Sequence, residues 1–446
     1  MKVKAAATAA AAASDPRKAA IRSLIRIEKD GRYSNLETES VLRGGEMTGP
    51  DRRLYSRLVY GAIERKITLD LIISQYSKLP PERLDPECRI ALRLGLYQLL
   101  FSDRIPDHAA VSGTVGAVRE RFRGYVNGVL RSFIRAEKKY RLPPRDRAAE
   151  YLSAAYSASP SVVSVLTESY GEERAEEILS SSAGERPICL RLNTLRSGAS
   201  SRLPDGARPA EGALAGIAAF ADALTPEIRR GIENGDWFVE DASSIIAAET
   251  LGALPGDSVA DVCSAPGGKS FSTAIRMENR GNLASFDIRE NKLSLVRDGA
   301  ARLGIDIIRT ERRDGRSPDE SLFGSFDRVL VDAPCSGLGV IGKKPEIRYK
   351  GADEISLLPG IQRGILEASA KYVAPGGVIV YSTCTLNRKE NEEVASSLFT
   401  PGSPFEPVGF DVPGVGKSEG GMLTIFPRAG EFPTDGFFIA AGRKKS

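Results

Sequence analysis

The chain contains few of the residues that most metal and nucleophile sites require. Its 446 residues include one histidine, His108, and five cysteines, which form no Cys-x-x-Cys pair. A single histidine argues against most zinc sites, Ser-His-Asp triads and Cys-His dyads, and we predict no metal. Scattered cysteines in odd number indicate reduced thiols, so we expect a cytoplasmic protein. A reactive cysteine here must be activated by something other than histidine.

Long apolar runs are also missing. No run approaches the ~18 apolar residues needed to span a bilayer, so we expect no membrane association. Residues 1–14 contain two lysines followed mainly by alanines. Because alanine forms a poor signal-peptide core, we expect these residues to be a disordered tail.

Charge is spread unevenly along the chain, although the formal net charge is only +4. Residues 15–145 hold 26 Lys and Arg against 16 Asp and Glu, and the residues after 145 are acidic on balance. A basic domain joined to an acidic one suggests a polyanionic partner. A solvated helical surface is the alternative, and charge alone does not decide between the two.

Two regions precede residues 238–446, the part of the chain with the clearest pattern of strands and helices. Residues 15–145 space their apolar side chains at three and four, which predicts an all-helical domain. A proline pair at 143–144 marks its end. Residues 146–237 combine a helical pattern with the strand-like run 187–194, and we expect a small α/β (RRM-like) subdomain there.

Residues 238–446 alternate strand and helix patterns. This alternation predicts a doubly wound α/β Rossmann-like domain with a parallel sheet. The expected helices cover residues 269–277, 290–303, 361–373 and 390–398. The expected strands cover residues 257–263, 281–288, 305–312, 326–333, 376–384 and 435–442.

Three successive strand ends carry residues suited to a nucleoside cofactor. After the first strand, Gly267 and Gly268 let the backbone approach a ligand, and Lys269 opens a helix. The spacing is not that of a Walker A phosphate loop. Asp287 ends the next strand, where an acid often binds ribose hydroxyls, and Asp314 follows the third. S-adenosylmethionine fits this pattern better than NAD or ATP.

Two further strand ends each carry a cysteine. Cys335 follows 328-RVLVDAP-334, and Cys384 ends 377-GVIVYSTC-384. A thiolate that attacks carbon 6 of a pyrimidine makes carbon 5 nucleophilic toward a methyl group. Asp332 could hold the cytosine ring, and the second thiol could assist release of the product. Buried cysteine is often only a small apolar filler, but two at neighbouring strand ends favour function.

These motifs together resemble the RNA cytosine-5 methyltransferases of the RsmB (Sun, Fmu) and NSUN group. Residues 17–141 also resemble the NusB-like helical domain of the bacterial RsmB branch, through 59-VYGAIERK-66, 93-RLGLYQLLF-101 and 125-YVNGVLR-131. The segments that carry the methyltransferase resemblance are 239-VEDASS-244, 261-DVCSAPGGKS-270, 313-RDGR-316, 326-FDRVLVDAPCSGLGVIGKKPEIRY-349, 380-VYSTCTLNRKENE-392 and 435-DGFFIA-440.

The resemblance implies a role for each matching residue. Cys384 would be the nucleophile, and Cys335 would assist release of the methylated RNA. Cytosine-5 DNA methyltransferases instead use the cysteine of the Pro-Cys segment as nucleophile, and the sequence alone leaves this reverse assignment open. The residues that would bind S-adenosylmethionine are Cys263, Ser264, Ala265, Pro266, Gly267, Gly268, Lys269, Asp287, Asp314 and Asp332.

We therefore expect a monomeric enzyme that transfers a methyl group to carbon 5 of a cytosine in ribosomal RNA, with 16S rRNA as the expected substrate. An inactive RNA-binding assembly factor and a DNA cytosine methyltransferase are the alternatives. Intact cofactor and thiol motifs argue against the first, and the lack of a DNA target-recognition region argues against the second. The chain departs from the family at Ser264, where alanine is common, and in residues 422–438, which lack a histidine.

Overall fold

The computed structural model describes residues 15–45, 47–182, 186–196, 203–428, 430 and 432–446. The tail predicted for residues 1–14 lies outside this range. Contacts group the chain into two compact units. The first unit contains residues 1–164 and 344–349, and the second contains 165–343 and 350–446. The three-domain division expected from the sequence stays a prediction, because residues 146–164 group with the helical unit here.

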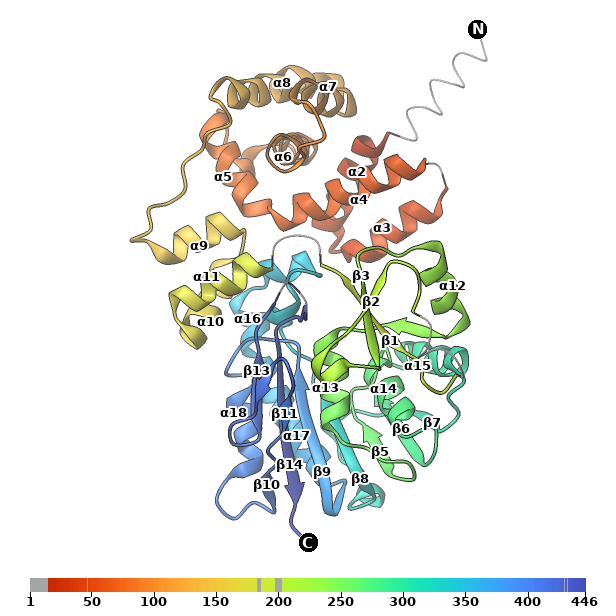
Figure 1. Ribbon diagram of the computed structural model, residues 1–446. Helices are drawn as coiled ribbons and strands as arrows, with labels where there is room; N and C mark the ends of the chain where they lie inside the picture. The colour runs from red at the N-terminus through yellow and green to blue at the C-terminus, as the bar shows by residue number, and fades with distance from the viewer. Residues whose placement is uncertain (1–14, 46, 183–185, 197–202, 429, 431) are drawn as a thin grey trace. The chain divides into compact units, whose positions relative to one another are not determined.

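The first unit is all-helical in its described part, as the sequence predicts (Figure 1). Helix α6 lies at its centre and contacts α2, α4, α5, α7 and α8. Gly95 on α6 lets α8 approach closely, because a Cβ there would lie 2.5 Å from the Leu130 side chain. The helices are α2 (Pro16–Asp30), α3 (Ser34–Arg43), α4 (Gly49–Glu64), α5 (Lys66–Tyr76), α6 (Pro86–Phe101), α7 (Asp107–Ala117), α8 (Glu120–Arg135) and α9 (Ala148–Tyr156).

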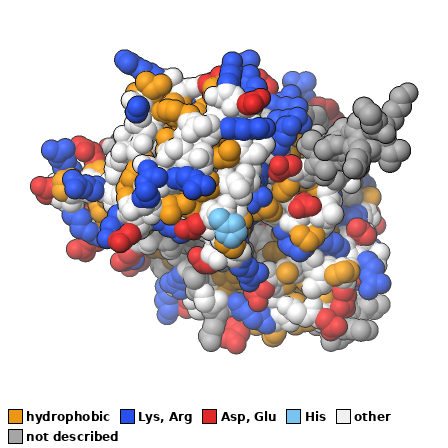
Figure 2. Space-filling view, turned by 90° about the horizontal axis from the view of Figure 1, so that it is seen from above, with side chains coloured by type: hydrophobic (Ala, Val, Ile, Leu, Met, Phe, Trp, Pro, Cys, Tyr) orange, Lys and Arg blue, Asp and Glu red, His pale blue; other side chains and the backbone are white. Residues whose placement is uncertain are grey.

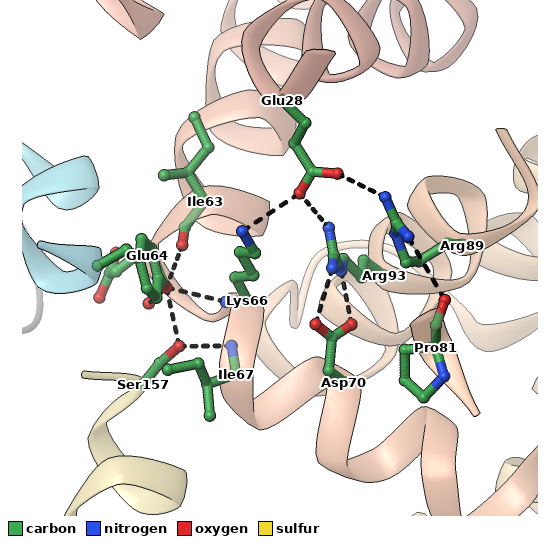
Figure 3. Close-up of polar contacts among 11 residues, drawn as sticks. Glu28, Ile63, Glu64, Lys66, Ile67, Asp70, Pro81, Arg89, Arg93 and Ser157 are labelled. Atoms are coloured by element: carbon green, nitrogen blue, oxygen red, sulfur yellow. Dashed lines mark hydrogen bonds and ion pairs between the residues drawn. The ribbon is translucent and has the colours of Figure 1, made fainter. Parts of the chain in front are cut away.

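An ion network around the buried Arg93 joins three of these helices (Figure 3). The Arg93 guanidinium on α6 is almost fully buried and donates to both carboxylate oxygens of Asp70 on α5, at 2.7 Å each. It also donates to Glu28 on α2, which accepts a further bond from Arg89 at 3.0 Å. A buried guanidinium is stable only when its charge is matched, so the network fixes how α2, α5 and α6 pack.

A short segment from late in the sequence completes the helical unit. Residues 344–349 belong to it although they follow the Cys335 strand by several residues. Arg348 is buried and donates to the carbonyl of Tyr156 at 2.9 Å. The Tyr349 hydroxyl lies 2.9 Å from Ser157 Oγ and accepts a bond from the Lys66 backbone N–H at 3.2 Å. The helical unit is therefore not one continuous stretch of sequence.

The second unit contains a small antiparallel sheet, in the order β2-β3-β1-β4. Leu190, Ile228 and Trp237 lie in the apolar cluster that joins this sheet to α12. The elements of this part are α10 (Pro160–Tyr170), which crosses the boundary between the units, α11 (Glu172–Ser181), β1 (Ile188–Leu192), β2 (Ala207–Pro209), β3 (Ala218–Ala221), α12 (Pro226–Asn234) and β4 (Trp237–Val239). The α/β character expected around residues 187–194 is confirmed.

The large sheet of this unit has eight strands among the described residues, in the order β10-β14-β9-β8-β5-β6-β7, with β13 beside β14 (Figure 1). Strands β5 to β9 are parallel, so their carboxyl ends lie at one edge. The strands are β5 (Ser258–Asp261), β6 (Asn282–Asp287), β7 (Ile308–Arg312), β8 (Phe326–Asp332), β9 (Val373–Thr383), β10 (Phe405–Pro407), β13 (Met422–Ile425) and β14 (Phe437–Lys444).

Helices cover both faces of this sheet, which confirms the doubly wound prediction. Along β8, Leu330 packs in one apolar cluster, and Val329 and Val331 pack in the other, because successive side chains point to opposite faces. The first cluster includes residues of α13 (Ala242–Thr250), α14 (Gly268–Arg276) and α15 (Glu290–Leu303), and the second includes residues of α17 (Leu358–Ala370) and α18 (Glu392–Ala395).

Two expectations about this sheet need correction. Strand β14 runs antiparallel to β9, so the sheet is mixed rather than parallel throughout. The helix expected over residues 390–398 is only the short α18, followed by a 3-10 turn over Ser396–Phe399. Here the polar side chains of the preceding turn form buried hydrogen bonds that compete with helix formation. In the described part of the chain, no helix is both long enough and apolar enough to cross a membrane.

Candidate active site

The predicted cofactor loop connects β5 to α14, as the sequence suggests. Its backbone is held by both neighbouring strands, because Val262 donates to the Leu330 carbonyl and Ser264 donates to the Phe286 carbonyl. Gly267 has φ +115°, and a Cβ there would lie 2.4 Å from the Phe271 ring. Only glycine fits this position, because both the dihedral angle and the close ring exclude a side chain. The loop is therefore a fixed, open backbone turn at a helix N-terminus.

Two buried carboxyl groups line the base of this loop. Asp261, the last residue of β5, accepts a bond from Ser270 at 2.6 Å, while its Oδ1 is buried with no partner among the described residues. Burial raises the pKa of Asp261 to about 7. Glu240 is buried next to Gly268, where a Cβ would lie 2.7 Å from Glu240 Oε1, and burial likewise raises its pKa to about 7. Both groups therefore titrate near neutral pH.

The next two predicted acids lie at the ends of the neighbouring strands. Asp287 ends β6 and accepts a bond from the Arg289 backbone N–H at 2.9 Å. Asp314 lies just beyond β7, and hydrogen bonds from Arg316 lower the pKa of its carboxyl group. Both side chains are only half-buried. The sheet order β8-β5-β6-β7 thus places Asp332, the loop, Asp287 and Asp314 along one edge.

The third acid, Asp332, links the cofactor loop to the cysteine strands. It accepts a bond from Lys269 Nζ at 2.7 Å and from Ser382 Oγ at 2.9 Å. Burial alone would lower the pKa of Lys269, but the Asp332 carboxylate and nearby Glu240 help to raise it overall. The charge of Cys384 contributes in the same direction. Lys269 therefore keeps its positive charge, which interacts with both the Asp332 carboxylate and Cys384.

The two predicted thiols lie in direct contact. Cys335 Sγ and Cys384 Sγ are 3.3 Å apart and half-buried, and the two residues follow the neighbouring strands β8 and β9. The pKa of Cys335 is raised, first by its hydrogen bond to Cys384, then by loss of water contact, and further by Glu390 and Asp332. Cys335 therefore keeps its proton at neutral pH, and its sulfur lies within hydrogen-bond distance of the Cys384 sulfur.

Two facing glycines brace the Cys384 loop. The Gly339 N–H donates to the Cys384 carbonyl at 3.0 Å, and the Gly436 N–H donates to the Gly339 carbonyl at 2.9 Å. A Cβ on Gly339 would lie 1.9 Å from the Gly436 carbonyl oxygen, so the backbones touch. The preceding residue, Asp435, is buried and paired with Lys343 at 2.7 Å. The Asp-Gly-Phe-Phe segment at the start of β14 therefore supports the Cys384 loop through its backbone.

The other residue types noted in the sequence lie in the helical unit. His108 is exposed on α7, and Figure 2 shows it as the pale-blue side chain among scattered Lys and Arg. Several of the expected basic residues pair with nearby acids, including Lys138 with Asp107 at 2.6 Å. Arg131 and Arg135 of α8 are exposed and donate to neutral acceptors, Asn127 Oδ1 and Ser132 Oγ. Their positive charges remain unneutralised within the described residues.

Sequence reasoning missed the two buried acids, Asp261 and Glu240. The signal for Asp261 was present, since it lies near the end of the expected strand 257–263, which precedes the glycine turn. Glu240 lies within a segment that resembles the family, but nothing in the local pattern distinguishes a buried acid from an exposed one.

Comparison with known proteins shows what the two parts of the chain are similar to. Residues 248–443 match the family model described as 16S rRNA methyltransferase RsmB/F, and residues 14–135 match the NusB family. The probable ribosomal RNA small subunit methyltransferase B of Bacillus subtilis is 35% identical over 441 residues, which cover 96% of this chain and 98% of that protein.

Two further comparisons cover most of the chain. The ribosomal RNA small subunit methyltransferase B of Escherichia fergusonii is 30% identical over 398 residues, covering 84% of this chain and 90% of that protein. The crystal structure of PH0851 superposes with a TM-score of 0.76 at 26% identity, covering 96% of this chain and 99% of the other.

Proposed function

The chain belongs to the 16S rRNA methyltransferase RsmB/F family, and from that premise we propose that it methylates carbon 5 of a cytosine through a covalent cysteine–cytosine adduct. The observation that carries the proposal is the pair of thiols 3.3 Å apart beside the cofactor loop. A methyltransferase that acts on a nitrogen or a hydroxyl group needs no thiol, whereas carbon 5 of cytosine becomes nucleophilic only after attack at carbon 6.

The methyl donor is S-adenosylmethionine, which supplies an electrophilic methyl group. The residues present fit this cofactor. Gly267 and Gly268 leave backbone uncovered, and the buried Asp261 Oδ1 lacks a partner among the described residues, as expected beside a polar ligand. Asp287 lies at the usual position for binding a ribose. We propose that residues 263–269 hold the cofactor together with Asp287, Asp314 and Asp332.

Cys384 is the proposed nucleophile. A thiol must lose its proton to attack, and a nearby cation favours the thiolate. Lys269 supplies this positive charge, since the interaction with Cys384 helps to raise the pKa of Lys269. The sulfur then bonds to carbon 6, the ring electrons move toward carbon 5, and Asp332 would bind the ring at its nitrogen 3 edge.

Cys335 is proposed to assist release. After methyl transfer a base takes up the carbon 5 proton, and the electrons of that C–H bond re-form the ring double bond. The bond between carbon 6 and Cys384 then breaks, and its electron pair goes to the sulfur. The raised pKa of Cys335 means that it holds a proton next to the departing sulfur. Its hydrogen bond stabilises the thiolate as it leaves. Because Cys335 is protonated at rest, it is better suited to donate a hydrogen bond to the departing sulfur than to act as a base.

The helical unit is proposed to bind the RNA backbone. Arg131 and Arg135 keep exposed positive charges on α8, and such charges attract phosphates without reading sequence. The target base would enter the methyltransferase site from an unpaired or opened segment. Small-subunit ribosomal RNA is the expected substrate.

The decisive experiment replaces each thiol in turn, with 16S rRNA from cells that lack this protein as substrate. Cys384→Ala should abolish transfer of labelled methyl groups. Cys335→Ala should accumulate a covalent protein–RNA adduct, visible as a shifted band on denaturing gels. Cys88→Ala, which removes a thiol from the helical unit, should behave like the wild type and serves as the control.

The opposite pattern would reverse the two roles. If Cys335→Ala abolishes transfer and Cys384→Ala accumulates adduct, Cys335 is the nucleophile. Bisulfite sequencing of the treated RNA identifies the modified base, and methylation of any atom other than carbon 5 of cytosine would refute the proposal. A matched DNA substrate should remain unmodified.

A further inference from the structure

Glu390 is a buried carboxylate without a cation. It lies in the turn that follows Cys384, its side chain is fully buried, and no Lys or Arg among the described residues is within ion-pair distance. Four hydrogen bonds replace the missing cation. Oε2 accepts from the Ser336 backbone N–H at 2.8 Å and from Gln362 at 2.9 Å. Oε1 accepts from Ser336 Oγ and from Asn387 at 2.9 Å.

These bonds fix the residues on both sides of Cys335. Ser336 follows the cysteine and donates to Glu390 through both its backbone and its hydroxyl group. Pro334 precedes the cysteine, and its carbonyl accepts a bond at 2.9 Å from the same Gln362 amide that binds Glu390. The backbone around Cys335 is therefore held from two sides by one buried group of side chains.

The same turn fixes the residues on both sides of Cys384. Thr383 donates through Oγ1 to Asn391 Oδ1, and the Asn391 amide donates to the Thr385 carbonyl at 3.0 Å. Thr385 Oγ1 also lies 2.6 Å from Ser336 Oγ, which joins the two cysteine loops directly. Both loops thus meet at Ser336 and Glu390.

We propose that Glu390 is a positioning residue that holds the Cys335 and Cys384 loops together, so that the two sulfurs stay in contact. The inference rests on the proposed roles of the two thiols and adds the residue that sets their geometry. A carboxylate is needed because all four partners are donors, and a neutral amide would turn an N–H group toward two of them.

The electrostatic effect of Glu390 agrees with this position. The pKa of Cys335 is raised by the hydrogen bond to Cys384 and by loss of water contact, and the charges of Cys384, Glu390 and Asp332 add to the effect. Cys384 directly follows β9, Glu390 lies in the turn after it, and Asp332 ends β8. A fixed negative charge behind Cys335 disfavours a second charge on its sulfur.

The test compares Glu390→Gln with Glu393→Gln, which removes an exposed charge three residues later. Glu390→Gln should lower kcat for RNA methylation by about tenfold or more, because small displacements of reacting groups are costly. Its KM for S-adenosylmethionine should stay near the wild-type value. Because Cys335 would no longer be held beside the departing sulfur, Glu390→Gln should also accumulate covalent protein–RNA adduct. Glu393→Gln should match the wild type in all three measurements.

A measurement without RNA separates this inference from the proposed function. Diamide oxidises two thiols to a disulfide, takes up both hydrogens and becomes the corresponding hydrazine. The rate of cross-linking between Cys335 and Cys384, followed by mass spectrometry, reports whether the sulfurs remain in contact. Glu390→Gln should slow this cross-linking by about tenfold or more. If Cys335→Ala accumulates no cytosine adduct, the proposed function fails, but the cross-linking rate still decides the role of Glu390.

Wild-type rates of both methylation and cross-linking in Glu390→Gln would overturn the inference. If that variant fails to fold, as judged by its melting temperature and its cofactor binding, Gln362→Met decides instead. It removes only the amide that joins Pro334 to Glu390, so it should slow both processes in the same direction and to a smaller extent. Unchanged rates in Gln362→Met would then overturn the inference.

Discussion

The buried acid Glu240 makes the stability of this protein depend on pH in an unusual direction. Its side chain is 7% exposed and accepts a bond from Ser272 beside the cofactor loop. Burial raises the pKa of Glu240 from 4.5 to about 7, although Ser272 and Lys269 oppose the change. Replacing Glu240 by glutamine keeps the size and the accepting oxygen but removes the ionisation. The Glu240→Gln variant should therefore lose this part of the pH dependence.

The sign and size of the effect follow from proton linkage. Between pH 4.5 and 7 the folded protein keeps the proton on Glu240 while the unfolded chain loses it, so stability falls as pH rises. Each pH unit between these two values lowers the free energy of unfolding by about 1.4 kcal/mol. The free energy of unfolding should therefore be about 3 kcal/mol lower at pH 8 than at pH 4.5. As the pH rises from 4.5 to 8, the free energy of unfolding of Glu240→Gln should thus increase by about 3 kcal/mol relative to that of the wild type.

Urea unfolding at several pH values between 4.5 and 8 measures this difference directly. Asp261 also has a pKa raised to about 7, but it is present in both proteins and cancels in the comparison. Glu233→Gln, which changes an exposed acid on α12, is the matched control and should show no such trend. A difference between Glu240→Gln and the wild type that stays constant within about 0.5 kcal/mol would refute the reasoning, since that is the usual size of surface effects.

Three further predictions concern the thiol site. Because the Cys335 and Cys384 sulfurs are 3.3 Å apart, diamide should form an intramolecular disulfide between them, detected by mass spectrometry. This disulfide should stop methylation, and dithiothreitol should restore activity. Two thiols that stay free in diamide would contradict the contact. Gly339→Ala should lower the free energy of unfolding by about 1–3 kcal/mol and reduce kcat, because the added Cβ would collide with backbone atoms. Gly351→Ala should change neither, because a Cβ there meets no atom within 4 Å. Lys269→Met should reduce methylation by about a hundredfold or more by leaving its carboxylate partner without a cation, and near-normal turnover would argue against that ion pair.

Local patterns in the sequence predicted the strand ends well. The apolar runs before Cys335 and Cys384 are strands β8 and β9, and the strand before the glycine turn is β5. Buried parallel strands read as continuous apolar runs, so their ends are visible without a structure. Asp287 also lies where the pattern placed it, at the end of β6.

Buried polar groups and strand direction were not visible in the same way. Nothing in the sequence distinguishes Glu390, which is fully buried, from the exposed Glu393, because burial of a charge depends on donors from distant segments. The antiparallel direction of β14 is set by its pairing with β9 and not by its own composition. Helix α7, with its Gly, Ser and Thr residues, lacks the apolar stripe on which periodicity arguments depend.

Residues 344–349 have a consequence for how this protein can be divided. A fragment that begins at residue 165 would carry Arg348 and Tyr349 without the Tyr156 carbonyl and the Ser157 hydroxyl that they bind. A fragment that ends at residue 164 would lack the side chains that complete its own interior. Neither fragment contains all the residues of its own unit. A chimera that exchanges the helical part between relatives would therefore also have to exchange residues 344–349. Two fragments cut at residue 164 should instead be soluble together and unstable apart.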